Sequence, residues 1–189
     1  MLSATIAVTV SVKIYTKNGD SGKSKTLTGQ QKAKSDLLFE VLGTIDELNA
    51  SLGFLQQSKK RKLAAQVTKV QSDLFKLGSF IAGSPMKSSD VVWITARVAE
   101  IETAIDEIDT QNKPLKNFIL PGGSVESAQL HFARTICRRL ERTLVAYLSK
   151  VKTDQFAVCE TYFNRLSDLL FVLARFYNNK GNADVIWKP

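Results

Sequence analysis

The sequence predicts an all-α fold, a bundle of amphipathic helices that follows an extended N-terminal loop. Apolar residues recur at steps of three and four residues over five separate stretches, the period of a helix with one buried face. Short breaks rich in glycine, proline or charged residues separate these stretches. With 189 residues and no internal repeat, the chain fits one domain. We expect an extended segment and loop at 1–34, the helices at 35–178 and a tail at 179–189.

The first 34 residues lack the helical period. Residues 5–15, TIAVTVSVKIY, are β-branched and partly alternating, which favours an extended segment. Residues 16–29, TKNGDSGKSKTLTG, are dense in glycine, serine, threonine and lysine and follow no period. They predict a long loop, and such a loop in a compact domain is usually functional or disordered.

The first helix is expected to follow Ser35 or Asp36, either of which can cap its N-terminus. Its predicted apolar stripe consists of Phe39, Leu42, Ile45, Leu48, Leu52 and Leu55. Small and polar residues follow a different line of the same helix, at Gly43, Asp46, Asn49 and Gly53. This seam would let another backbone approach the helix while it presents the carboxylate of Asp46.

The second and third helices repeat the pattern. After the basic loop KKRK at 59–62, residues 63–82 predict a bundle seam of Leu63, Val67, Val70, Leu74, Leu77 and Ile81. Gly83, Ser84 and Pro85 end that helix. The third helix begins near Ser89 or Asp90, and its apolar positions are Val91, Ile94, Val98, Ile101, Ile105 and Ile108.

A Pro-Gly-Gly turn opens the fourth helix, which is expected to run to about Ser149. Its buried face is predicted to hold Leu130, Ala133, Cys137, Leu140 and Leu144. Arg134, Arg138 and Arg142 are four residues apart, so they project from one side, with Glu141 beside them. Guanidinium groups match phosphate and carboxylate oxygens two at a time, which favours an anion site. A solvated stripe held by Glu141 explains the same pattern.

The last helix is expected over about 154–178. Its core face is predicted to consist of Phe163, Leu166, Leu170, Leu173 and Tyr177. A second face carries Asn164, Asp168, Phe171 and Arg175.

Composition narrows the choice of partner. The formal charge of +8 and the pI of about 9.5 suit nucleic acid, an anionic membrane surface or an anionic small molecule. Aromatic residues are not interleaved with the basic ones, which disfavours a nucleic-acid stacking platform.

No stretch is long and apolar enough to cross a membrane, and residues 1–12 lack the features of a secretory signal or a mitochondrial presequence. Two cysteines within helical patterns predict reduced thiols and an intracellular protein.

Several familiar motifs can be rejected. GDSGKS at 19–24 is not a Walker A loop, because the first glycine would have to stand at Lys17 and a helix would have to follow. Glycines among lysines would still suit phosphate oxygens, although a merely flexible loop is the alternative; the lysines are Lys17, Lys23, Lys25 and Lys34. The single histidine, His131, and two lone cysteines provide neither a metal-ligand spacing nor a nucleophile–base pair. The remaining features are a glycine- and lysine-rich loop, an arginine row, a polar helix face that contains asparagine, and no evident general base. They suit a reaction in which a phosphate chain is held and its charge is stabilised as it leaves.

At these same residues the chain resembles the PduO-type ATP:cob(I)alamin adenosyltransferases. The resemblance covers nearly the whole chain and rests on five segments in order: KIYTKNGDSG at 13–22, GTIDELNASLGF at 43–54, FILPGGS at 118–124, LHFARTICRRLER at 130–142 and FNRLSDLLFVLAR at 163–175. It implies a five-helix bundle with ferritin-like up-down packing. The implied reaction is ATP- and Mg²⁺-dependent transfer of the 5′-deoxyadenosyl group to the cobalt of a reduced corrinoid, with release of triphosphate.

The resemblance also implies roles for individual residues. The triphosphate would be wrapped by Thr16, Lys17, Asn18, Gly19, Ser24, Lys25 and Lys34. The nucleotide site would be completed by Arg138, Glu141, Arg142 and Asn164, and Mg²⁺ would bind mainly through the ATP phosphates rather than through protein ligands. Asp46 and Arg134 would pair across a subunit interface, and Phe118 would help to exclude the lower ligand of the corrin. Leu140 stands where alanine is usual in the family and is expected to face the core.

The family further implies a homotrimer with its sites between subunits. A corrinoid reductase and an adenosylcobalamin-dependent enzyme are the protein partners it suggests, with no role for nucleic acid or membrane. The expected location is the cytoplasm, or the mitochondrial matrix for a eukaryotic source. Two other functions are weighed against the enzyme: a non-catalytic relative that binds ATP or corrinoid as a sensor or cofactor chaperone, and a basic nucleic-acid-binding bundle.

Overall fold

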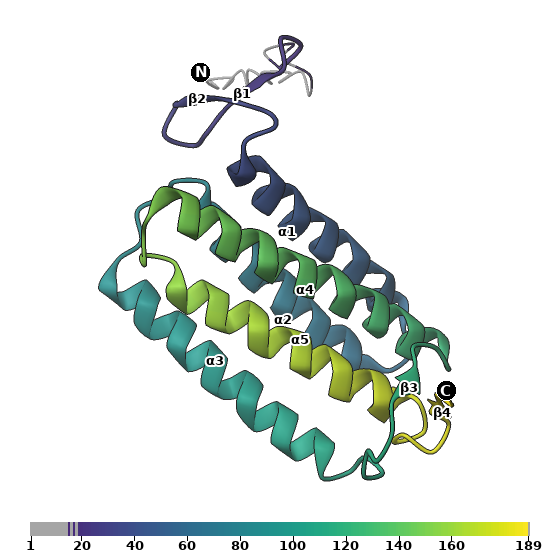
Figure 1. Cartoon of the computed structure of the whole chain (residues 1–189). Coiled ribbons are helices and arrows are strands. Elements are labelled where there is room, and N and C mark those ends of the chain that lie inside the picture. Colours follow the sequence, from purple (N-terminus) through teal and green to yellow (C-terminus); the bar gives the residue numbers. More distant parts are fainter. Residues whose placement is uncertain (1–14, 16, 18, 189) are drawn as a thin grey trace, which may run out of the picture.

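The computed structural model describes Tyr15, Lys17 and residues 19–188. Five α-helices make up most of it: α1 (Leu37–Gly53), α2 (Arg61–Ile81), α3 (Ser88–Asp109), α4 (Val125–Val151) and α5 (Ala157–Tyr177). A short 3₁₀ turn, η1 (Phe54–Gln57), continues α1. The helices lie side by side as a bundle, which confirms the predicted fold class (Figure 1). The predicted extended segment at 5–15 lies outside the described residues except for Tyr15.

Helix ends follow the expected capping chemistry. Asp36 caps α1 by accepting a hydrogen bond from the backbone N–H of Leu38 at 2.9 Å, and this bond lowers the pKa of the Asp36 carboxyl. Ser124 caps α4 by accepting from the N–H of Ser127 at 3.2 Å. The Pro-Gly-Gly turn therefore delivers the chain directly into a capped helix.

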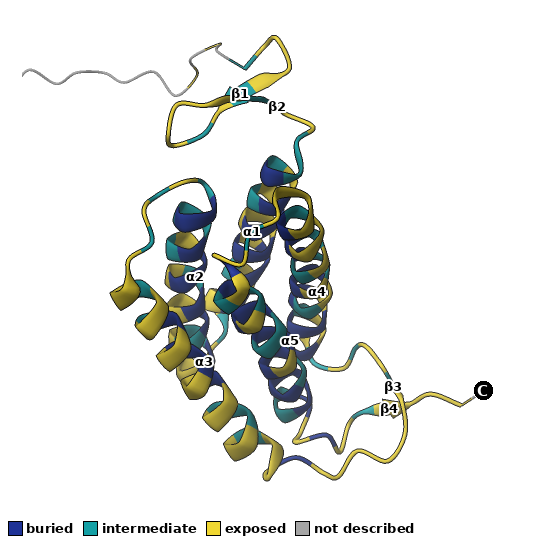
Figure 2. Cartoon of the chain, turned by 60° about the vertical axis from the view of Figure 1, so that its left-hand side comes forward, coloured by how far each residue is buried: buried dark blue, intermediate teal, exposed yellow. Residues whose placement is uncertain are grey.

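The core lies where the apolar faces of the helices meet. α4 packs against α5 and α1, α3 packs on α5, and α2 packs on α1. Figure 2 shows the buried residues turned inward on every helix, with α3 the most exposed. All six seam residues predicted for α2 are buried, as is Leu140. In α3, Ile94, Val98 and Ile101 are buried, whereas Val91 is exposed.

The predicted stripe of α1 is wrong in its first turn. Leu38 and Val41 are buried there, whereas Phe39 and Leu42 are only partly buried. Repeated three-residue steps fall short of a full turn by about 60° each, so a stripe through Phe39 and Leu42 drifts around the helix. The alternating steps from Leu38 through Val41 to Ile45 stay on one face.

Two small two-stranded antiparallel sheets complete the fold. β1 (Lys23–Lys25) pairs with β2 (Gln31–Ala33), with Ser24 opposite Lys32. The expectation of an irregular loop over 16–29 is therefore wrong for its second half. The strands are short and polar, so no apolar alternation marks them, and a turn that ends at Gly29 (φ 80°) closes them. β3 (Ile119–Leu120) pairs with β4 (Val185–Ile186), which lies in the predicted tail.

The β1–β2 hairpin and the β3–β4 sheet lie at opposite ends of the bundle in both views (Figures 1 and 2). Leu27 in the β1–β2 turn donates its N–H to the carbonyl oxygen of Ala82, just after α2, at 3.3 Å. The β1–β2 hairpin is thus held at the C-terminal end of α2. Of the helices described, none is long and apolar enough to span a membrane.

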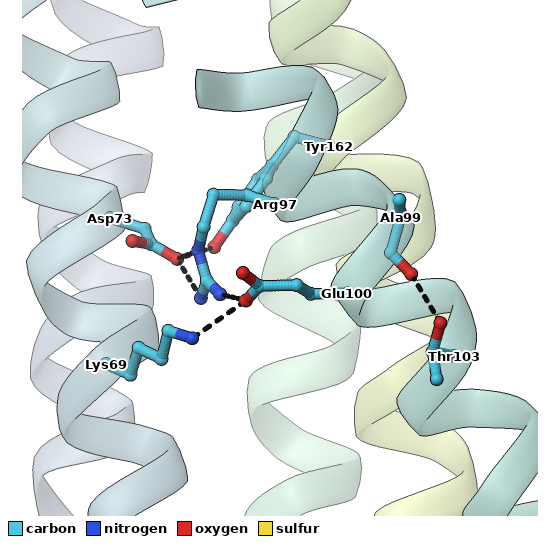
Figure 3. Close-up of polar contacts among 7 residues, drawn as sticks. All are labelled: Lys69, Asp73, Arg97, Ala99, Glu100, Thr103 and Tyr162. Atoms are coloured by element: carbon cyan, nitrogen blue, oxygen red, sulfur yellow. Dashed lines mark hydrogen bonds and ion pairs between the residues drawn. The ribbon is translucent and has the colours of Figure 1, made fainter. Parts of the chain in front are cut away.

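A polar network with a buried centre and an exposed rim joins α2, α3 and α5 (Figure 3). Asp73 accepts hydrogen bonds from Arg97 Nε at 2.9 Å, from Arg97 Nη2 at 2.6 Å and from the Tyr162 hydroxyl at 2.9 Å. Arg97 Nη1 also donates to Glu100, which accepts from Lys69 Nζ at 2.7 Å. Every member is satisfied, so the network fixes α3 against its neighbours at no cost in unpaired charge.

Candidate functional site

The predicted arginine row lies on the exposed side of α4. Arg134 is partly buried, whereas Arg138 and Arg142 are exposed. Arg142 Nη1 donates to the carbonyl oxygen of Arg138 at 3.0 Å. Within the described part of the chain, none of the three guanidinium groups forms an ion pair with a carboxylate. The row is therefore a concentration of positive charge that the described chain does not neutralise.

Arg134 is the most constrained member of the row. Its Cζ lies 5.9 Å from the centre of the Phe171 ring on α5, and its Nε is buried without a hydrogen-bond partner in the described chain. Burial lowers the pKa of Arg134, and the neighbouring charge of Arg138 lowers it further. A cation held against an aromatic face with an unused donor is suited to accept an anionic partner from outside the protomer.

His131 packs beside Arg134 on the inner side of α4. Its ring meets the Phe171 ring edge-on at 5.9 Å between centres, and its Nδ1 has no hydrogen-bond partner in the part of the chain that is described. Burial lowers its pKa, as does the positive charge of Arg134, while Asp184 acts in the opposite direction. The imidazole is therefore neutral at pH 7, and it packs against the same Phe171 ring that Arg134 faces.

The fold brings Glu141 and Asn164 together from two helices. Asn164 Nδ2 on α5 donates to Glu141 Oε1 on α4 at 2.8 Å, and the Asn164 amide oxygen accepts from Arg165 Nη1. Glu141 lies about one turn beyond Arg138 on α4, and it holds the Asn164 amide of α5 beside it. Sequence periodicity placed the two residues on separate helices, and only the packing of α4 on α5 makes them neighbours.

Neither cysteine is available as a nucleophile. Cys137 is fully buried, and burial raises the pKa of its thiol far above the usual range. Burial raises the pKa of Cys159 to about 12. Both thiols stay protonated and buried, so they serve packing rather than chemistry.

Phe118 lies directly before β3, in the connection that leads from α3 to the N-terminal end of α4. Its side chain is 80% exposed, and its carbonyl oxygen accepts from the N–H of Trp187 at 2.8 Å. The two aromatic residues line an open cavity of about 450 Å³ together with Leu115, Lys116 and Asn117. An exposed pair of large aromatic side chains marks a binding surface more often than a packing defect.

Trp187 is a candidate that sequence reasoning missed. It lies in the predicted tail, 69 positions beyond Phe118, and nothing in the local sequence predicts that the two residues meet. Only the pairing of β3 with β4 places it there. The one available signal was the apolar run Val185-Ile186-Trp187 at the end of a polar segment.

The N-terminal hairpin gathers the basic residues predicted to wrap a triphosphate. The Lys34 side chain covers Gly19 so closely that a Cβ there would lie 2.8 Å from Lys34 Nζ, and the Lys34 N–H donates to the carbonyl oxygen of Gly22 at 2.8 Å. Lys17 and Lys25 are exposed, and Ser24 is partly buried in β1. Thr16 and Asn18 lie outside the described residues.

Within one chain, these groups do not form a single site. The lysine-bearing β1–β2 hairpin and the β3–β4 sheet, which Phe118 directly precedes, lie at opposite ends of the bundle, and α4, which bears the arginine row, runs between them (Figure 1). Asp46 is exposed on α1, where it lines an open groove of about 270 Å³ with Leu27, Phe75 and other residues of α1 and α2. Asp46 makes no ion pair with Arg134 in the described chain, and their pairing stays a prediction.

No cluster of three or more histidine, cysteine or acidic side chains that could hold a metal ion occurs among the described residues.

Comparison with known proteins gives a consistent result. The model of the family "Cobalamin adenosyltransferase" matches residues 14–177. A corrinoid adenosyltransferase of Homo sapiens is 40% identical over 184 residues, which cover 93% of this chain and 73% of that protein. A corrinoid adenosyltransferase of Bacillus subtilis is 38% identical over 180 residues, which cover 92% of this chain and 91% of that protein.

Solved structures with the same fold carry ligands. One is a phenylalanine-to-histidine variant of a PduO-type ATP:corrinoid adenosyltransferase from Lactobacillus reuteri complexed with cobalamin and ATP. Its TM-score is 0.79 at 31% identity, with 93% of this chain and 97% of that chain covered. An arginine-to-lysine variant of the Lactobacillus reuteri protein, complexed with ATP, has a TM-score of 0.77 at 30% identity, with 93% and 100% of the two chains covered.

Proposed function

The chain belongs to the cobalamin adenosyltransferase family, and on that premise we propose that it transfers the 5′-deoxyadenosyl group of ATP to the cobalt of a reduced corrinoid. The observation that carries this proposal is the row of arginines on α4 that has no carboxylate partner in the described chain. Such a row is suited to receive the charge of a triphosphate leaving group.

The chemistry requires positioning more than proton transfer. The cob(I)alamin cobalt is the nucleophile and attacks the 5′-carbon of ATP. A cobalt–carbon bond forms, the bond between that carbon and the triphosphate oxygen breaks, and the electron pair leaves with the triphosphate. No proton has to move in this step, which agrees with the absence of an evident general base from the sequence motifs. Alignment of the two substrates then supplies most of the acceleration.

Each group of residues has a place in that reaction. Arg138 and Arg142 stabilise the negative charge that develops on the triphosphate, and Glu141 with Asn164 orients the nucleotide beside them. Lys17, Lys25 and Lys34, on and beside the β1–β2 hairpin, bind the phosphate chain, and Mg²⁺ arrives with those phosphates. Phe118 presents an apolar face to the corrin and keeps water away from the cobalt.

We further propose that the complete site lies between copies of the chain in a homotrimer. The separation of the β1–β2 hairpin from the β3–β4 sheet beside Phe118 supports a site built from more than one protomer. Asp46 on the α1–α2 side and Arg134 on the α4–α5 side of a second copy would make a heterologous contact, the kind that closes into a ring. A cytoplasmic location, a corrinoid reductase and an adenosylcobalamin-dependent enzyme as protein partners remain part of this proposal.

The decisive experiment mixes the protein with ATP, Mg²⁺ and chemically reduced cobalamin and follows the visible absorbance of the adenosylated product. We expect adenosylcobalamin and triphosphate to form in equal amounts. Binding of both substrates without turnover would overturn the enzyme and favour the sensor or chaperone. Tight, strongly salt-dependent binding to nucleic acid with no response to ATP would favour the basic bundle.

A further inference from the structure

A buried ion pair between Arg175 and Asp184 helps to tie the C-terminal segment after α5 to the bundle. The Arg175 side chain is 3% exposed and that of Asp184 is 6% exposed. Arg175 Nε donates to Asp184 Oδ2 at 2.8 Å. Arg175 Nη2 donates to the carbonyl oxygen of Lys113 at 2.5 Å, in the connection from α3 to β3. The Arg175 guanidinium therefore links the segments that precede β3 and β4, alongside a backbone hydrogen bond from the Lys113 N–H to the Lys180 carbonyl oxygen at 2.8 Å.

The second oxygen of Asp184 extends the same cluster to the start of α4. Asp184 Oδ1 accepts from Asn178 Nδ2 at 2.9 Å, and Asn178 Oδ1 accepts from the N–H of Ser124 at 3.2 Å. Ser124 is also the cap of α4, and its hydroxyl donates to the carbonyl oxygen of Tyr177 at 3.0 Å. The cluster thus joins the end of α5, the Pro-Gly-Gly turn and the C-terminal segment.

Two glycines allow this close assembly. Gly181 has a φ of 79°, and a Cβ there would lie 2.7 Å from Arg175 Nη2. Gly123 has a φ of 97°, and a Cβ there would collide with the Asn178 amide. Both positions need the left-handed backbone and the missing side chain that only glycine supplies. The cluster is therefore built into the backbone as well as into the side chains.

The cluster ends just before β4, which pairs with β3 beside Phe118, the residue predicted to help exclude the lower ligand of the corrin. β4 starts at the residue after Asp184, with Val185 opposite Leu120 and Ile186 opposite Ile119. The next residue, Trp187, donates its N–H to Phe118. Two strands of two residues each cannot hold this register alone, because even a two-stranded hairpin, whose strands a turn connects, is marginal in water.

We propose that Arg175 and Asp184 are positioning residues, which clamp β4 onto β3 and thereby hold Phe118 and Trp187 in place at the open cavity they line. This inference rests on the proposed function, because the cavity matters only if a corrin occupies it. The clamp acts through Phe118 and Trp187 and touches no reacting atom. Its loss should weaken corrinoid binding and leave the distant nucleotide hairpin unaffected.

The experiment compares two ways to open the clamp with a matched control. Asp184→Asn removes the charge from the ion pair, and Ile186→Pro disturbs the strand pairing without touching that pair. Asp73→Asn is the control, because it weakens the other buried arginine–aspartate pair, whose side chains are 8% and 7% exposed. The Michaelis constants for cob(I)alamin and ATP and the melting temperature are measured for each variant.

We expect Asp184→Asn and Ile186→Pro to raise the KM for cob(I)alamin by roughly tenfold or more, the scale for misplaced binding groups, while the KM for ATP stays within about twofold. Asp73→Asn should lower the melting temperature and leave both constants unchanged. If Asp184→Asn leaves the corrinoid constant unchanged, or raises both constants together, the positioning role is wrong.

A fluorescence measurement separates the clamp from the proposed activity. Trp93 and Trp187 are the only tryptophans, so Trp93→Phe makes Trp187 the sole reporter. In that background, Asp184→Asn should shift the Trp187 emission to longer wavelength, whether or not the enzyme turns over. An unchanged emission would overturn the clamp. A wild-type protein that makes no adenosylated product would instead overturn the proposed function.

Discussion

Arginine plays two different parts in this bundle. Arg97 on α3 is 7% exposed and is fully engaged by Asp73 and Glu100, with Tyr162 completing the cluster (Figure 3). Arg134 and Arg138 on α4 have no carboxylate partner in the described chain, and the Arg134 Nε is buried without an acceptor. Arginine with a complete set of acceptors serves the fold, whereas the unpaired arginines of α4 are the ones proposed to meet a ligand or another subunit.

The largest effect on stability is expected when Arg97 loses its partner Asp73. Asp73→Ala would leave Arg97 buried with only Glu100, and breaking such a pair costs about 3–5 kcal/mol. We expect a loss of that size in the free energy of unfolding, measured by urea titration, with the kinetic constants of the folded fraction unchanged. Replacing both partners, Asp73→Leu with Arg97→Met, should recover most of the loss. A stable single variant would show that the network contributes little.

The opposite outcome is expected for Arg138→Ala. Removal of one positioned donor should reduce kcat/KM by about 2–4 kcal/mol of transition-state stabilisation, roughly 30- to 1000-fold. The free energy of unfolding should change by less than about 0.5 kcal/mol, since the side chain is exposed. The control is Arg139→Ala, one residue along α4, because Arg139 already pairs with Glu47 on α1. Near-normal turnover of Arg138→Ala would remove this residue from the site.

Substitution of Asp46 tests whether Arg134 forms an ion pair with another copy of the chain. Asp46→Asn should weaken self-association by about 2 kcal/mol, a modest value for an interfacial charge pair, and activity should then depend on protein concentration. Sedimentation over a range of concentrations measures the association. Glu47→Gln, on the adjacent residue, is the control. If assembly and activity both survive Asp46→Asn, the pairing with Arg134 is wrong.

The smallest effect is expected from His131, whose pKa is lowered by burial and by Arg134. The unfolded chain binds a proton at this residue more readily than the folded chain does. Its contribution to stability is therefore complete above the ordinary histidine pKa of about 6.5 and is lost as the pH falls through the lower pKa of the folded state. Between pH 7.5 and 5.5, the melting temperature should fall less in His131→Gln than in the wild type. Equal falls would show that His131 does not titrate against the arginine row.

The sequence predicted the helical parts of the molecule well because helix periodicity is local. Leu63, Val67 and Val70 occupy the predicted seam of α2, and Asp36 caps α1 as expected. Polar strands such as Lys23–Lys25 and Gln31–Ala33 carry no such period, so their pairing could not be predicted. The Asp73–Arg97 pair was missed for a related reason: its two members lie 24 positions apart on different helices.

By itself, the sequence determined the class of fold and the chemistry that is available: five amphipathic helices, an arginine row and a glycine- and lysine-rich segment. Helix period and residue type are properties of neighbours along the chain, so no tertiary information was needed. The tertiary structure alone decided which arginines are neutralised, that Glu141 meets Asn164, and that Trp187 joins Phe118. Those facts depend on where distant segments pack, because an acceptor from another helix or strand settles whether a charge serves the fold or remains free for a ligand.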